Sequence, residues 1–182
     1  MLRRAAEKPD PERHGLRVVH LPFQIHPEIP PGGIEAGPRQ GPMYAALERE
    51  AAQAGLPLNW PARLPDTRAA LAASAWVRQH RPDVSDEFNR RLFAAHFALG
   101  EDLGDTAVID RKAKELDIDL DALRAALADG SALASLTEAE ALGARFGVRS
   151  TPSWLISGKL VAGLLPPSEF ERLAESAMRQ SR

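Results

Sequence analysis

Cysteine is absent from all 182 residues of the sequence. Without a thiol the chain can form no disulfide bond, and it has no thiolate to act as a nucleophile or as a metal ligand. The sequence also lacks any apolar run near the roughly 20 residues that span a lipid bilayer, so no membrane partner is expected. The missing thiol is the strongest constraint that the composition places on function.

A strong excess of one charge is absent as well. Lys and Arg number 23 and Asp and Glu number 25, for a formal net charge of −2. No bulk attraction to nucleic acid is therefore expected, and no nucleic-acid partner is predicted. The first eight residues are charged and lack the apolar core of a secretory signal peptide. These features predict a cytoplasmic protein.

Metal-ligand spacings are missing too. No pair of the five histidines has the i, i+4 spacing of a helical metal site, and His20 and His96 are interpreted as structural residues. Residues 117–121 begin like a calcium loop, but Ala122 stands where such a loop requires glycine. Asp119 is better explained as the cap of the following helix. We predict neither a metal nor any other cofactor.

What is present is mainly helical. In the middle of the chain, apolar residues recur at helical spacing, and capping residues mark where helices begin. Ser85 and Asp119 are positioned as N-caps, and Gly55 and Gly147 follow predicted C-termini. The predicted helices cover residues 2–8, 43–54, 68–80, 86–99, 106–116, 120–129, 131–146 and 167–179.

Strands are predicted near the two ends of the chain. The β-branched run at residues 16–25 reads as a strand, and Pro22 suggests an edge position or the end of that strand. Residues 26–42 hold five prolines and four glycines and are predicted to be a loop. Two short apolar runs, 153–157 and 160–163, predict a strand pair. We therefore predict an α/β fold in which a helical insertion interrupts a sheet domain.

The bulky aromatic side chains are the natural candidates for the core. Trp76, Trp154, Phe93 and Phe97 are predicted to pack between the helical insertion and the sheet. Trp60 lies in a proline-flanked loop, and it is predicted to be exposed or at an interface.

Several segments, taken in order, resemble one known family. They read PFQIHPEIP at 22–30, LPDTRAA at 64–70, LFAAHF at 92–97, GD at 104–105, GVRSTP at 147–152 and GLLPPSEF at 163–170. On these segments the chain is similar to the DsbA-like thioredoxin-fold proteins, and specifically to their FrnE-type branch. The resemblance implies a thioredoxin-like fold, incomplete at the N-terminus. Its thioredoxin-like domain would comprise residues 1–42 and 131–182, with an all-helical insertion domain at residues 43–130.

The resemblance also implies a function. Family members exchange thiols and disulfides through a Cys-x-x-Cys motif that follows a first strand, and this sequence contains neither the motif nor that strand. The residue pair Thr151 and Pro152 matches the family's cis-proline loop, which binds a substrate peptide or a small thiol. With no catalytic residue to name, we expect this cysteine-free chain to be inactive as given.

Two interpretations stay open. In the first, the chain is a truncated or motif-less thiol–disulfide oxidoreductase. In the second, it is a non-catalytic thioredoxin-like module that binds a peptide, a small thiol or a partner chain. The missing strand would be central, and unpaired backbone groups are costly. Four explanations fit: a start codon assigned too late, a degenerate gene product, a rearranged sheet, or a strand supplied in trans within a homodimer.

Overall fold

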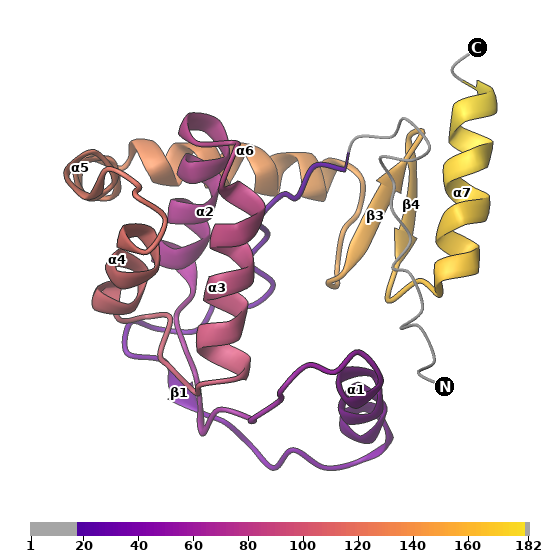
Figure 1. The fold of residues 1–182 in the computed structure, drawn as a ribbon, viewed down its shortest axis with the longest axis horizontal. Helices are drawn as coiled ribbons and strands as arrows, with labels where there is room; N and C mark the ends of the chain where they lie inside the picture. Colours follow the sequence, from indigo (N-terminus) through magenta and orange to yellow (C-terminus); the bar gives the residue numbers. More distant parts are fainter. Residues whose placement is uncertain (1–17, 181–182) are drawn as a thin grey trace, which may run out of the picture. The chain divides into compact units, whose positions relative to one another are not determined.

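The computed structural model describes residues 18–180 of the chain, so the helix predicted at residues 2–8 lies outside the described residues. In chain order the elements are β1 (Ile34–Glu35), α1 (Pro42–Gln53), β2 (Arg63–Leu64), α2 (Arg68–His80), α3 (Ser85–Phe97), α4 (Thr106–Lys114), α5 (Leu120–Asp129), α6 (Ser131–Arg145), β3 (Ser153–Ile156), β4 (Lys159–Ala162) and α7 (Pro167–Gln180). Figure 1 shows the path of the chain through them. Helices fill the middle of the chain, as predicted.

The described chain divides into two compact units. The helical unit comprises Pro22–Glu140, and the sheet unit comprises residues 18–21 and 141–180 of the described chain. The domain boundaries predicted from the sequence, at 42/43 and 130/131, stay a prediction. Each unit is described here by itself.

Local side-chain bonds set the ends of two helices in the helical unit. The Asp105 carboxylate accepts a bond from the Ala107 backbone N–H at 2.8 Å at the start of α4. The Asp119 carboxylate accepts one from Ala122 at 3.0 Å at the start of α5, which confirms its predicted capping role. α5 ends at Gly130, whose φ of 83° suits a residue without a side chain.

The start of α3 differs from the prediction. Ser85 is the first residue of this helix, and Val84 occupies the cap position without a side-chain hydrogen bond. Ser85 is buried, so its side chain lies against the interior of the helical unit rather than across the helix end. The predicted capping role of Ser85 is therefore wrong.

Small side chains let the helices of this unit pack closely. α2 buries alanines along most of its length together with Trp76 and Val77, which confirms Trp76 as a core residue. Larger side chains from α3 to α6 fill the remaining space. The largest fully buried side chains are Phe88, Ile109, Leu123, Leu136 and Val77.

Phe93 corrects the predicted core. Its side chain is 63% exposed, whereas the preceding residue, Leu92, is buried. Successive residues on a helix point about 100° apart, so at the border of a buried face one side chain can face the core while the next faces solvent. Phe97 is half-buried and stacks on Phe93, with ring centroids 6.2 Å apart.

A small sheet lies where the sequence predicts only a loop. β1 pairs antiparallel with β2, in the register Ile34 with Leu64 and Glu35 with Arg63. The backbone is tightly packed here, because a Cβ added to Gly33 would lie 2.4 Å from the Leu64 carbonyl oxygen. The Arg63 guanidinium also donates to the Gly32 carbonyl at 2.7 Å. The segment between residues 26 and 42 is therefore partly ordered by pairing.

The strand predicted at residues 16–25 is wrong over its described part. Residues 18–25 have no strand structure, and Val18 and Val19 are 37% and 50% exposed. A strand needs a neighbour for its backbone groups, and within the described range no strand pairs with this segment. Pro22 also lacks the N–H that a ladder would use. β-branched composition alone did not decide the structure.

The sheet unit is built on a hairpin. β3 pairs antiparallel with β4, and Ser157 and Gly158 form the two-residue turn with φ values of 48° and 77°. Two consecutive positive φ values suit the right-handed twist of a hairpin. α7 lies along β3 (Figure 1), where the rings of Trp154 and Phe170 meet edge to face at 5.1 Å. Trp154, predicted as core, is half-buried.

Candidate substrate-binding site

Thr151 and Pro152 lie at the end of the loop that connects α6 to β3. α6 ends at Arg145, and Gly147 turns the chain with a φ of 75°. Thr151 and Pro152 are both exposed, and the peptide bond between them is cis. The predicted site is therefore a surface loop that leads directly into a strand.

Short hydrogen bonds hold this loop from one side. The Ser153 hydroxyl donates to the Ser150 carbonyl at 2.7 Å. The Gly163 N–H donates to the Pro152 carbonyl at 2.8 Å, which continues the β3–β4 ladder by one pair. The Trp154 indole N–H donates to the Gly163 carbonyl at 3.2 Å. These bonds leave the opposite side of the loop open.

The open side carries unpaired backbone groups. In a hairpin closed by a two-residue turn, hydrogen-bonded and non-hydrogen-bonded pairs alternate from the turn outwards. Ile156 and Trp154 therefore bond to β4, whereas Leu155 and Ser153 direct their N–H and C=O groups away from it. Thr151 continues the alternation, and it makes no hydrogen bond to any residue in the range 18–180. The outer edge of β3 can thus accept an extended chain.

Neither catalytic nor metal chemistry is evident elsewhere among residues 18–180. No group of three or more His, Cys, Asp or Glu side chains in that range could hold a metal ion. His96, predicted to be structural, is buried, and its Nδ1 lies 3.3 Å from the Glu101 carbonyl oxygen. Burial lowers the pKa of His96, and Arg39 acts in the same direction, while the Glu101 carbonyl and Asp102 oppose it. Its environment favours the neutral ring.

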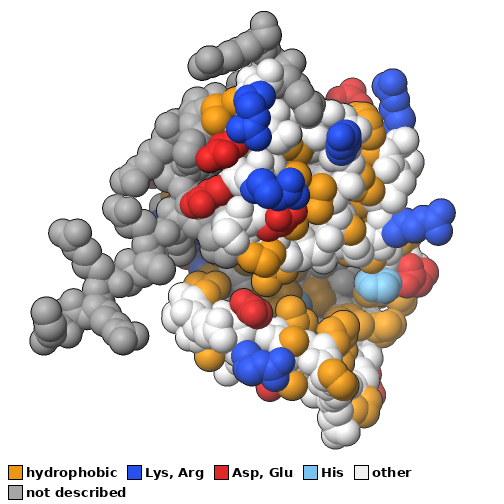
Figure 2. All heavy atoms as spheres, turned by 90° about the vertical axis from the view of Figure 1, so that its right-hand side faces the viewer, with side chains coloured by type: hydrophobic (Ala, Val, Ile, Leu, Met, Phe, Trp, Pro, Cys, Tyr) orange, Lys and Arg blue, Asp and Glu red, His pale blue; other side chains and the backbone are white. Residues whose placement is uncertain are grey.

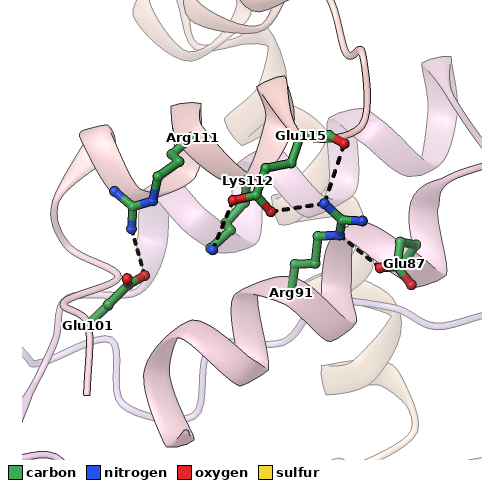
Figure 3. Close-up of polar contacts among 6 residues, drawn as sticks. All are labelled: Glu87, Arg91, Glu101, Arg111, Lys112 and Glu115. Carbon is green, nitrogen blue, oxygen red and sulfur yellow. Dashed lines mark hydrogen bonds and ion pairs between the residues drawn. The ribbon is translucent and has the colours of Figure 1, made fainter. Parts of the chain in front are cut away.

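The most extensive charged cluster joins α3 to α4 (Figure 3). Arg91 lies 2.8 Å from Glu87 and 2.9 Å from Glu115, and Lys112 lies 3.1 Å from Glu115. The hydrogen bond from Lys112 lowers the pKa of Glu115, and the bond from Arg91 adds to this effect. Each of these charges has a partner of opposite sign, so the cluster reads as a structural connection between helices.

Further ion pairs serve the same purpose. Arg111 lies 2.7 Å from Glu101, a contact that Figure 3 also shows, and Arg124 lies 2.6 Å from Asp110. The second pair connects α4 to α5. These charges of the helical unit are paired with one another and not directed toward a common point, which argues against a catalytic role.

A buried polar contact brings together two of the segments that carry the family resemblance. The Arg68 guanidinium donates to the Gln24 side-chain oxygen at 2.9 Å, and Gln24 is buried. The Asp66 carboxylate accepts from the Arg68 backbone N–H at 3.0 Å, and Glu140 lies 3.6 Å from the Arg68 side chain. Sequence reasoning did not predict this contact. The sign of this contact in the sequence was that segments 22–30 and 64–70, which both carry the family resemblance, occur in the same chain.

A second unpredicted cluster surrounds Trp60 in the helical unit. Its ring meets Tyr44 edge to face at 5.3 Å, and the Arg39 guanidinium lies 5.5 Å from its centroid. The Trp60 indole N–H donates to Glu48 at 2.8 Å. Trp60, which was predicted to be exposed or at an interface, is half-buried.

Hydrophobic side chains also reach the surface of both units, and Figure 2 shows several of them on one face among charges of both signs. They include Met43 and Leu47 in the helical unit and Leu155 and Leu164 in the sheet unit. None of the helices within residues 18–180 has the length and apolar character needed to cross a membrane.

Comparison with known proteins places this geometry in context. Residues 1–175 match the family model described as "DSBA-like thioredoxin domain". Among solved structures, a "putative protein disulfide isomerase" from Nitrosomonas europaea is similar, with a TM-score of 0.64 and 15% identity over 82% of this chain and 80% of that one. That likeness shows the fold, which is α/β and thioredoxin-like with helices inserted between its strands. A search of curated proteins found no match.

Proposed function

The chain belongs to the DSBA-like thioredoxin domain family, a family of thiol–disulfide oxidoreductases, and on this premise we propose that it is a substrate-binding member that cannot itself exchange thiols and disulfides. Thr151 and Pro152 would bind the backbone of a peptide or of a small thiol compound. The observation that carries the proposal is the open backbone of Thr151 next to the outer edge of β3. An extended peptide can add to such an edge by main-chain hydrogen bonds.

The branch within the family is part of the proposal. The segments at 22–30, 64–70 and 147–152 support a FrnE-type relative. In such relatives a first strand and a Cys-x-x-Cys motif come before the strand equivalent to residues 17–21. The first cysteine would attack the substrate disulfide as a thiolate, and the second would resolve the mixed disulfide. Neither cysteine is part of the given sequence.

The chemical half of the proposal can be tested directly. Purified protein of this sequence should reduce insulin disulfides no faster than a control that contains only the small-molecule thiol. The physical reason is that no side chain in the sequence can form a mixed disulfide. Reduction above the control would contradict the proposal.

The binding half needs a separate experiment. The probe is a fluorescein-labelled, unstructured decapeptide with one S-methylated cysteine, followed by fluorescence anisotropy. Thr151→Pro removes the backbone N–H at this position and should abolish binding, whereas Thr151→Val keeps the N–H and should retain it. Circular dichroism on each variant shows whether the fold is intact. Equal binding by a folded Thr151→Pro variant would rule out backbone recognition at Thr151.

A non-catalytic binding module is the second candidate, and the complete absence of cysteine favours it. In this alternative the partner is a peptide, a small thiol or another copy of the chain. The homodimer version is supported by β3, which within the described residues pairs on one side only, with β4. Light scattering on the purified chain separates a dimer from a monomer. An upstream reading frame that encodes a strand and Cys-x-x-Cys would favour the oxidoreductase instead.

A further inference from the structure

The sequence segment that contains the candidate site carries charges of one sign. Residues 141–168 contain Arg145, Arg149 and Lys159 and no Asp or Glu at all. The helical unit, Pro22–Glu140, differs sharply, with 19 Asp and Glu against 12 Lys and Arg. The loop before Thr151 and the hairpin after it are thus a basic segment in a chain whose net charge is negative.

These basic side chains are not neutralised by acidic neighbours. The acids of the sheet unit lie on α7, where Glu169 pairs with Arg172 and Glu175 pairs with Arg179, while Glu171 is exposed. Among residues 18–180, no carboxylate forms an ion pair with the three cations of the basic segment. Within the described part of the chain, their charge is thus not taken up by an ion pair.

Of the three exposed cations, Arg149 lies on the loop that enters β3, and Lys159 lies on β4 opposite the last residue of β3. Arg149 comes two residues before Thr151, and Lys159 pairs with Ile156 at the far end of the strand. The stretch of chain from Arg149 to Ile156 spans at most about 25 Å, and an extended decapeptide of about 33 Å is long enough to reach both cations. Leu155 lies between them and is 44% exposed, which offers an apolar contact to the middle of such a peptide.

We propose that the site at Thr151 and Pro152 selects acidic peptides, with Arg149 and Lys159 as the residues that determine this specificity. The inference rests on the proposed function, since it names the substrate class of the same site. Carboxylates near the two ends of the bound segment would each meet one unpaired cation, whereas Lys or Arg in those places would be repelled. Charge complementarity of this kind acts on specificity and on the association rate.

The test compares three labelled decapeptides that share the same apolar centre. The flanking residues are Glu in the acidic peptide, Gln in the neutral one and Lys in the basic one. The acidic peptide should bind about tenfold more tightly than the basic one in 50 mM salt, because each exposed ion pair contributes modestly. The preference should shrink several-fold in 500 mM salt, where the Debye length falls to about 4 Å.

A charge-reversed variant sharpens the test. The double variant Arg149→Glu, Lys159→Glu should bind the basic peptide better than the acidic one, and both positions are exposed, so the fold should persist. The control is Lys114→Glu, which makes one such charge reversal on exposed surface of α4 in the helical unit and should leave the acidic preference in place.

The outcomes separate the two proposals. Equal binding of acidic and basic peptides, with binding still lost in Thr151→Pro, overturns the acidic preference and leaves the proposed function standing. Binding of none of the three peptides overturns both. Loss of the preference in Lys114→Glu would mean that net charge alone produces it, which also overturns the assignment to Arg149 and Lys159.

Discussion

The two units of this protein bury their side chains to very different extents. The helical unit encloses large apolar residues completely, among them Phe88, Leu123 and Leu136. In the described part of the sheet unit, the buried residues are two alanines of α7, Ala174 and Ala177, whereas its aromatic residues are half-buried. Regions with few buried contacts are those that open most easily and bind ligands. The larger buried core thus lies in the helical unit, and the sheet unit is the less buried of the two.

The largest effect is expected from a substitution in the core of the helical unit. Leu136→Ala removes a fully buried side chain from α6 and should lower the free energy of unfolding by about 2–5 kcal/mol, because a cavity remains. Chemical denaturation followed by circular dichroism measures the change. The matched control is Leu99→Ala, since Leu99 is 63% exposed and its loss should cost little. Similar losses for both variants would mean that this unit has no distinct core.

A smaller effect is expected in the sheet unit. Phe170→Ala removes the edge-to-face contact with Trp154 and should cost roughly 1–3 kcal/mol, since both rings are only half-buried. Amide hydrogen exchange should speed up in β3 and β4 while the amides of α2 keep their protection. Leu164→Ala, at a position that is 64% exposed, serves as the control. Equal deprotection of α2 would show that the units unfold together.

A helix cap gives the next effect in size. Asp119→Ala removes the acceptor at the start of α5 and should cost about 1 kcal/mol. Asp119→Asn keeps a capping side chain and should restore most of the stability. Asp121→Ala removes a nearby charge without removing the cap, which separates capping from charge. Urea midpoints for the three variants provide the measurement.

The pH dependence of the helical unit tests its buried histidine. Because burial lowers the pKa of His96 in the folded state, the unfolded state takes up a proton first as the pH falls. Stability should therefore decrease as the pH falls below the unfolded value of about 6.5. His96→Gln should flatten this decrease. A decrease of the same size in the variant would assign the effect to other groups.

The smallest effect concerns the ion pairs of α3 and α4. The hydrogen bond from Lys112 is the main cause of the lowered pKa of Glu115. The ionised Glu115 therefore stabilises the fold above the unfolded pKa of about 4.5, and this stabilisation is lost as the pH falls further. Glu115→Gln should weaken that acid-induced loss, and high salt should do the same to the wild-type protein. Thermal unfolding between pH 3 and pH 6 measures both. An unchanged profile would show that the pairs add nothing.

Sequence reasoning worked best where a local signal exists. α2 has the predicted bounds, and Asp119 caps α5, because periodicity and capping are properties of neighbouring residues. The α/β class came from the same kind of pattern, whereas the thioredoxin-like fold was implied by the family resemblance. The hairpin of β3 and β4 was also predicted, from the two apolar runs at 153–157 and 160–163. Its turn consists of Ser157 and Gly158, so Ser157 lies in the turn and not in the predicted strand.

Prediction from the sequence failed where the structure depends on residues that are far apart in the chain. The two-residue strands β1 and β2 have no periodicity to detect, and they form only because Ile34 meets Leu64 across the chain. The run at 16–25 has strand composition, yet over residues 18–25 it has no neighbour to pair with. Phe93 was assigned to the core because spacing alone does not say which of two adjacent side chains faces inward.

The candidate site was predictable in position but not in detail. The residue pair Thr151 and Pro152 came from a family resemblance, and its role in binding stays a prediction. Among residues 18–180, Thr151 makes no backbone hydrogen bond and Arg149 makes no ion pair, and both are properties of the folded chain. No sequence pattern predicts these two properties, because both depend on which groups lie near Thr151 and Arg149 in the folded chain.

The exposure of helix α1 determines how freely this part of the sequence can vary during evolution. None of its residues is buried, and Figure 1 shows it on an extended segment apart from the bundle of α2 to α5. Of its side chains, Tyr44 and Glu48 hold Trp60. Substitutions elsewhere in α1 should therefore be nearly neutral. A library of single substitutions should tolerate polar and apolar residues alike at Met43 and Leu47, which makes this helix the natural place for variation that leaves the rest of the protein unchanged.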